Sequence, residues 1–408
     1  MKKNTLFIII ISAIILLVAS CRGTEKIVPS TSTDTGSGTQ TDSTSQVDVS
    51  KGKVKGFFLL NEGNMGSNKS TLDYYDYETG IYTKNIYAER NPGVVKELGD
   101  VGNDLQIYGN KLYAVINCSN FVEVMDVRTA KHITTISVPN CRYIVFKDSY
   151  AYISSYAGPV KIDPNQRLGY VARVDTADLL PNLPISVHDQ MKIDTCIVGY
   201  QPEEMVISGD KLYVANSGGY MVPNYDSTVS VISLATFKEI KKINVGINLH
   251  RLELDRYGHL YVTSRGDYYN ISSKTYVIDT KTDEVINTLY LLPASEMTIC
   301  GDSLYAYSTE WSYVTNRNTV SYAIYNTKTQ RIVSRNYISD GTDKKIKIPY
   351  GTAVNPDNNE ILVTDAVDYV TPGTLYCFRA DGSLKWSVVT GDIPAHIAFT
   401  YQKLQPLE

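Results

Sequence analysis

The fold is decided by a pattern that is clearest at residues 209–218, which read GDKLYVANSG. In this stretch a tight turn precedes a short run of apolar and aromatic residues. Runs of this kind, bounded by Gly, Asp and Asn, are typical of β-strands. The run occurs seven times, as GFFLLNE (56–62), KLYAVIN (111–117), YAYISSY (150–156), KLYVANS (211–217), HLYVTSR (259–265), SLYAYST (303–309) and EILVTDA (360–366). Its third position is apolar or aromatic in every copy, so the runs predict equivalent strands of seven repeated units.

Each run lies in a unit that contains three further candidate strands. A second strand follows the run after a loop of variable length, beginning at Thr71, Phe121, Tyr170, Thr228, Lys274, Val320 and Thr374. A third strand comes after a turn rich in Thr, Lys, Asp and Gly, and a fourth precedes the run, as at 105–108 and 205–208. Four short antiparallel strands, repeated at roughly 40–60 residues, predict a β-propeller.

The two ends of the repeated region indicate how the ring closes. Residues 395–401, AHIAFTY, form a candidate inner strand that no further unit follows, whereas the first run at 56–62 has no inner strand before it. One blade built from both ends would remove the exposed strand edge that favours aggregation. We therefore predict an all-β fold over residues 54–408: a seven-bladed β-propeller of four-stranded antiparallel blades, closed by pairing of the N- and C-terminal strands.

The residues before the propeller predict export and anchoring. Residues 1–20 combine a positive start with an apolar stretch, which is typical of a signal peptide. The sequence LVASC ending at Cys21 resembles the lipobox of bacterial lipoproteins, which implies lipidation of Cys21 and attachment to a membrane through acyl chains. Residues 21–53 are rich in Ser, Thr, Asp and Gly, and we expect them to carry the lipid and to form a flexible tether.

Composition narrows the classes of partner. The formal net charge is −4, so the sequence gives no basic surface for nucleic acid. There are 32 Tyr against 8 Phe and 2 Trp, and tyrosine suits binding sites because an apolar ring carries a polar hydroxyl.

The cysteines after Cys21 show neither CxxC nor paired-His spacing, so we expect no metal site. Whether Cys118 and Cys141 form a disulfide stays open.

Three segments resemble the YncE/YVTN-like seven-bladed propellers: GDKLYVANSG (209–218), VSVISLATFKEIKKINVG (229–246) and VNPDNNEILVTD (354–365). The opening GFFLLNEGNMGSNKSTLDYYD (56–76), together with the lipobox and tether, resembles the BtuG family of cobalamin-binding surface lipoproteins of gut Bacteroidota. This resemblance implies capture of cobalamin (vitamin B12) or other corrinoids and their transfer to a BtuB-like TonB-dependent outer-membrane transporter. It implies an outer-membrane lipoprotein at the cell surface. No acidic cluster follows Cys21, so a periplasmic face stays open.

A ligand is expected on the face where the loops before the inner strands and after the runs gather. Aromatic residues of these loops could stack on a large flat ligand, and polar residues could bond its amides. The expected binding residues are Tyr156, Tyr220, Tyr268, Tyr269, Trp311, Tyr313, Tyr350 and Tyr369, with Asn103, Asp104, Arg142, Glu203, Arg251, Arg265, Glu296, Asp368, His250 and His396. Cobalamin would be a transported ligand and not a cofactor.

Two other functions stay open at this point. The same aromatic rim could bind a protein or glycan in an envelope scaffold. His250 and His396 occupy equivalent places before inner strands, and an imidazole can bind a metal or act as a base, so a metal-dependent lyase or lactonase is an alternative. The sequence contains no HExxH motif and no Ser-His-Asp arrangement, so we expect no enzyme and no catalytic residues.

Overall fold

The computed structural model describes residues 24–31, 52–94, 97–179, 192–312 and 317–406. The expected signal peptide and Cys21 lie outside these ranges. The helices within them are short: α1 (Ile86–Arg90) and two 3₁₀ turns, Thr176–Asp178 and Thr342–Lys345. None of the helices in the described part of the chain is long and apolar enough to cross a membrane.

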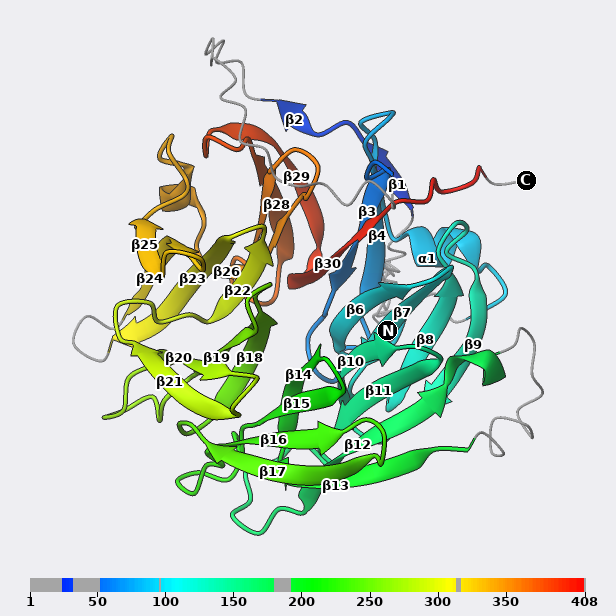
Figure 1. Cartoon of the computed structure of the whole chain (residues 1–408). Coiled ribbons are helices and arrows are strands. Elements are labelled where there is room, and N and C mark those ends of the chain that lie inside the picture. The colour runs from blue at the N-terminus through cyan, green and yellow to red at the C-terminus, as the bar shows by residue number, and fades with distance from the viewer. Residues whose placement is uncertain (1–23, 32–51, 95–96, 180–191, 313–316, 407–408) are drawn as a thin grey trace, which may run out of the picture.

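The described strands form seven antiparallel sheets arranged as blades around a ring (Figure 1). Blade 1 contains β30 (Pro394–Thr400), β3 (Gly56–Asn61), β4 (Thr71–Asp76) and β5 (Tyr82–Lys84). Blades 2 to 7, each from its inner strand outwards, are β6 (Gly102–Tyr108), β7 (Lys111–Ile116), β8 (Phe121–Asp126) and β9 (His132–Ser137); β10 (Cys141–Lys147), β11 (Tyr150–Ser155), β12 (Leu168–Asp175) and β13 (Asp194–Tyr200); β14 (Pro202–Ser208), β15 (Lys211–Asn216), β16 (Thr228–Ser233) and β17 (Lys238–Asn244); β18 (Leu249–Leu254), β19 (His259–Ser264), β20 (Lys274–Asp279) and β21 (Glu284–Leu289); β22 (Glu296–Cys300), β23 (Ser303–Ser312), β24 (Arg317–Asn326) and β25 (Arg331–Ser334); β26 (Pro349–Val354), β27 (Ile361–Asp365), β28 (Pro372–Phe378) and β29 (Leu384–Asp392). The predicted seven-bladed β-propeller is confirmed.

The ring closes in blade 1, as the sequence predicts. β30 from the C-terminus pairs antiparallel with β3, and Gly56 lies opposite Thr400. The other edge of β3 pairs with β4, so the C-terminal strand becomes the inner strand of a blade whose remaining strands come from the N-terminus. Because both edges of β3 are paired, the closure leaves this N-terminal strand with no edge open to another chain.

Two short strands lie inside the segment that we expected to be a tether. β1 (Glu25–Ile27) pairs with β5 at the outer edge of blade 1, and β2 (Ser30–Thr31) pairs with β29 at the outer edge of blade 7. Residues 24–31, which we call the N-terminal strap, therefore bridge the two blades on either side of a seam in the ring (Figure 1). The structure differs here from the expected flexible tether over 21–53, because the strap supplies backbone partners to two free sheet edges.

The alternation of side chains explains why the runs are apolar on both faces. In β15, Leu212 and Val214 belong to the core shared with blade 3. Tyr213, which lies between them, belongs to the core shared with blade 5, because successive strand residues point to opposite faces. Its hydroxyl donates a hydrogen bond of 2.5 Å to the Asp283 carboxylate, so the phenol is buried with its polar atom satisfied.

The cysteines of the described residues are all free thiols. Cys141 is buried and burial raises its pKa to about 12, whereas Cys118 is partly exposed. Cys118 and Cys141 therefore form no disulfide in this structure.

Candidate functional site

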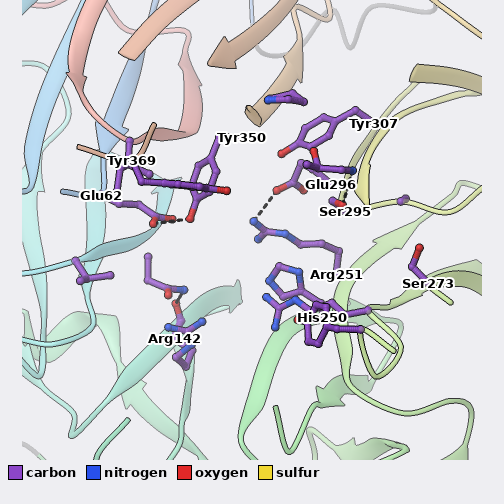
Figure 2. A pocket seen from close by; sticks show the side chains of 18 of the residues that line it. Glu62, Arg142, His250, Arg251, Ser273, Ser295, Glu296, Tyr307, Tyr350 and Tyr369 are labelled. Carbon is purple, nitrogen blue, oxygen red and sulfur yellow. Dashed lines mark hydrogen bonds and ion pairs between the residues drawn. The ribbon is translucent and has the colours of Figure 1, made fainter. Parts of the chain in front are cut away.

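A cavity of about 880 Å³ lies where the inner strands begin, at one end of the central channel. Inner-strand residues such as Arg142, His250 and Arg251 form its floor (Figure 2), and the loops that follow the seven runs form its rim. Seven of the described residues lining it are tyrosines: Tyr143, Tyr220, Tyr268, Tyr269, Tyr307, Tyr350 and Tyr369. The cavity combines aromatic walls with charged groups, which suits a ligand that has both a broad apolar face and polar edges.

The cavity brings together many of the residues that the sequence singled out. Those that line it are Asn103, Arg142, Tyr220, His250, Arg251, Arg265, Tyr268, Tyr269, Glu296, Tyr350 and Tyr369. They come from six of the seven blades, so the expected face and the expected loops do converge around one hollow.

Other predicted residues lie behind the lining and support it. Tyr156 is buried, and its hydroxyl donates a hydrogen bond of 2.5 Å to Glu203, which is itself buried beneath Arg142. Asp104 accepts the backbone N–H of Ile144 at 2.9 Å. These side chains make their hydrogen bonds to other protein groups. They therefore hold the lining residues in position and do not form the rim themselves.

The remaining predicted residues have different outcomes. His396 lies with its Nε2 3.4 Å from Oε1 of Glu62, beneath the lining. Asp368 uses its carboxylate within its own loop, accepting the amides of Val370 and Thr371 at 2.9 and 2.8 Å. Trp311 belongs to β23, and Tyr313 lies outside the described residues.

Arg142 makes the tightest ion pair on one wall of the cavity. Its Nε and Nη2 donate to Oε2 of Glu203 at 3.1 and 3.0 Å. Burial would raise the pKa of Glu203, but the charges of Arg142 and Arg265 outweigh that effect and lower it. Glu203 is therefore a fixed negative charge behind a positive wall.

Arg251 makes the corresponding link toward the opposite wall. Its Nη2 lies 2.5 Å from Oε2 of Glu296 (Figure 2). Its Nη1 lies 3.8 Å from Oε1 of Glu204. Burial raises the pKa of Glu296, and it raises the pKa of Glu204 to about 8. The Arg251 guanidinium thus lies next to two carboxyl groups, and burial disfavours the charged form of both.

His250 is held as a neutral imidazole at the floor. Arg251 donates a hydrogen bond of 2.9 Å to the hydroxyl oxygen of Tyr143, and that hydroxyl lies 3.2 Å from Nε2 of His250. Because the arginine can only donate, the Tyr143 proton is available for Nε2, which then accepts it. Burial, followed by the charges of Arg265, Arg251 and Arg142, lowers the pKa of His250 well below its usual value.

Three important lining residues were not among the sequence predictions. Glu62 accepts the Tyr350 hydroxyl at 2.8 Å across 288 positions of sequence (Figure 2), and Tyr143 and Tyr307 line the floor. One signal was available for Glu62. It is the seventh residue of its run, the position that also supplies Asn117, Arg265 and Thr309 to the cavity. Comparing that position across the seven runs would have found it.

The described residues contain no group of three or more His, Cys, Asp or Glu side chains that could hold a metal ion. His250 and His396 come from blades 5 and 1, and each has a partner of another kind, Tyr143 for the first and Glu62 for the second.

Comparison with known proteins places the chain in a family without assigned chemistry. A sequence model described as "Domain of unknown function (DUF5074)" matches residues 55–372, and no curated protein matches. Similar solved structures include hydrazine synthase of Kuenenia stuttgartiensis (16% identity, TM-score 0.56, 73% of this chain and 89% of that chain) and a quinonprotein alcohol dehydrogenase-like protein of Bacteroides thetaiotaomicron (16%, 0.54, 85% and 78%). Apo AztD of Citrobacter koseri is also similar (10%, 0.50, 86% and 99%). At these identities the likeness concerns the fold alone.

Proposed function

The chain belongs to the DUF5074 family, and we propose that it captures a corrinoid such as cobalamin in the channel cavity without chemical conversion. In this proposal it then transfers the ligand to a TonB-dependent outer-membrane transporter of the BtuB type. The proposal rests on one observation above all: a tyrosine-rich cavity of about 880 Å³ whose lining combines aromatic rings with polar groups, as binding of a broad ring edged with amides requires.

The rim supplies the apolar part of such a site. Tyr268, Tyr269 and Tyr369 have 54%, 73% and 41% of their surface exposed, whereas all other described tyrosines except Tyr290 are buried or half-buried. Rings held in water at the edge of a hollow are available to stack on a planar ligand. Their hydroxyl groups can at the same time bond the amides that surround a corrin ring.

The floor supplies polar groups whose arrangement favours binding over chemistry. Arg142 and Arg251 are held by carboxylates, and the Nε2 atom of His250 faces the Tyr143 hydroxyl. A general base needs a free lone pair directed at the substrate. A floor of interlocked charges instead presents fixed dipoles, which recognise a ligand at little cost in reorganisation.

The location proposed for the protein follows from the sequence around Cys21. Lipidation of this cysteine would hold the propeller at the outer membrane, with the cell surface as the face that suits capture from outside. Delivery to a transporter beside it requires only that the ligand leave from the same open cavity by which it entered.

The test is a titration of the chain from residue 22 onwards, which retains the N-terminal strap. Cyanocobalamin absorbs visible light, so binding can be followed by spectroscopy and by calorimetry. We expect saturable binding with one site per chain. No binding at micromolar ligand would overturn the corrinoid proposal, and retention of a protein or glycan from envelope extracts, unaffected by corrinoid, would favour a scaffold function.

A further inference from the structure

Two guanidinium groups share one carboxylate on one wall of the cavity. Glu203 Oε2 accepts both nitrogens of Arg142, and Glu203 Oε1 lies 3.5 Å from Nη1 of Arg265. The carboxylate is 1% exposed and lies behind the lining, whereas both arginines line the cavity. Two positive charges against one negative charge leave this wall with an unbalanced positive charge that faces the cavity.

Arg265 is the member of this group that has donors to spare. Glu203 Oε1 already accepts the Tyr156 hydroxyl at 2.5 Å, so the ion pair with Arg265 is long. Among the described residues, no hydrogen bond to the Arg265 guanidinium is formed, and 30% of its side-chain surface is exposed. A guanidinium presents five N–H donors in a rigid fork that fits two oxygens of an anion.

The opposite wall has the reverse character. Two carboxylates, Glu62 and Glu296, line it with one guanidinium, that of Arg251, which is paired with Glu296, so the formal charge of this wall is negative. Tyr350 donates to Glu62. Burial, and then the charges of Arg265, Arg251 and Arg142, lower the pKa of His250, so this histidine adds no positive charge of its own to the cavity. An anionic group entering the cavity is therefore attracted to one wall and repelled from the other, which fixes the orientation of a large ligand.

We propose that Arg265, with Arg142 beside it, forms a subsite for a phosphodiester group of the bound ligand. This inference rests on the proposed corrinoid function. Cobalamin carries one phosphodiester, in the nucleotide loop that hangs below its ring, and its peripheral groups are neutral amides. In the bound state this phosphate lies against the Arg265 fork while the ring lies toward the tyrosine rim.

The experiment compares two probes on two forms of the protein. Cyanocobalamin has the phosphodiester, whereas dicyanocobinamide has the same ring without the nucleotide loop. We expect Arg265→Gln to weaken cyanocobalamin binding by about 10- to 100-fold, the range for a lost charge-assisted hydrogen bond, and to leave dicyanocobinamide affinity unchanged within about twofold. Arg265→Lys retains the charge and should recover part of the loss.

The controls separate the subsite from the function. Arg331→Gln changes an exposed arginine of β25, outside the cavity lining, and should alter neither affinity. Equal losses for both probes in Arg265→Gln, or no loss for either, would overturn the phosphodiester subsite and leave corrinoid capture standing. Absence of binding of both probes to the unmodified chain would instead remove the proposed function together with the subsite. Thermal melting of each variant verifies that the propeller is folded.

Discussion

Tyr268 and Tyr369, which come from different blades, have the same backbone φ of 64°, and each directly follows an aspartate whose carboxylate accepts amides of its own loop. A positive φ is uncommon for a bulky residue, so each loop holds its tyrosine in a strained conformation. Asp267 accepts the amides of Tyr269, Asn270 and Ile271, and Asp368 acts in the same way in its loop. Loops of two different blades thus place a tyrosine ring at the cavity rim by the same backbone conformation.

Removal of the rim tyrosines is expected to weaken ligand binding cumulatively. One ring contributes about 0.5–1.5 kcal/mol beyond its area burial, so a single Tyr→Ala change should cost up to about tenfold in affinity. Changing Tyr268, Tyr269 and Tyr369 together should cost about 10- to 1,000-fold, measured by cyanocobalamin titration. Tyr290→Ala is the matched control, because Tyr290 is 70% exposed and lies outside the cavity lining. Full affinity in the triple variant would show that the rim has no part in binding.

Asp368→Ala is expected to weaken binding although Asp368 does not line the cavity. Loss of its carboxylate frees the amides of Val370 and Thr371, and the loop no longer holds Tyr369 in place. We expect a loss of affinity no greater than that of Tyr369→Ala, and no further loss when the two changes are combined. Independent, additive losses in this double-mutant cycle would mean that Asp368 acts on the ligand by another route.

The buried tyrosines of the runs are expected to matter for stability instead. Tyr213→Ala should lower the free energy of unfolding by about 3–5 kcal/mol, as truncations of large core side chains do. Tyr213→Phe keeps the ring and loses only the hydroxyl, which donates to the Asp283 carboxylate and lies 3.1 Å from the Thr280 carbonyl oxygen, so about 1–3 kcal/mol is expected. Chemical denaturation monitored by circular dichroism measures both. A larger loss for the Phe variant than for the Ala variant would contradict this division.

The stability of the propeller should fall as the pH rises from 6.5 to 8, through Glu204. Burial raises the pKa of this carboxyl to about 8, so the folded state keeps a proton that the unfolded state has already released. Where the folded state binds more protons, stability decreases with rising pH. His250, whose folded pKa is lowered, contributes a dependence of the opposite sign only below its ordinary pKa of about 6.5.

Glu204→Gln tests this dependence directly. The amide oxygen can still accept the backbone N–H of Leu252, which Glu204 accepts at 2.8 Å, but the side chain no longer titrates. Arg251, Glu296 and Asp104 are the other charged groups that act on this carboxyl. We expect the melting temperature of the unmodified protein to fall relative to that of the variant between pH 6.5 and 8. Parallel curves would show that Glu204 is ionised throughout this range.

The N-terminal strap provides a matched pair of neighbouring residues. Ile27 packs against the core shared by blades 1 and 7, whereas Val28 is 79% exposed. Ile27→Ser should therefore lower stability by about 1–2 kcal/mol, and Val28→Ser should have almost no effect. Equal and negligible effects in thermal melting would mean that the strap contributes nothing to closure of the ring.

The sequence by itself determined the fold. Seven runs that are apolar at successive positions must each bury both faces, and this is satisfied when every blade packs between two neighbours. The closure was also predictable, because the run at 56–62 lacked an inner strand and residues 395–401 supplied one. The face of the ring that carries the cavity followed from the order of strands within each unit.

The tertiary structure decided which side chains meet at the axis of the ring. Tyr143 and His250 are 107 residues apart, and Glu62 and Tyr350 are 288 apart, and strand periodicity does not say which groups from different blades pair there. The tertiary structure also buries Tyr156 and Glu203 behind the cavity lining. There the Glu203 carboxylate accepts the Tyr156 hydroxyl and pairs with Arg142, and these contacts stabilise its charge without solvent. The strands of the N-terminal strap could not be predicted for a related reason. The segment is polar and has no apolar pattern, and it is ordered by backbone pairing with two free sheet edges.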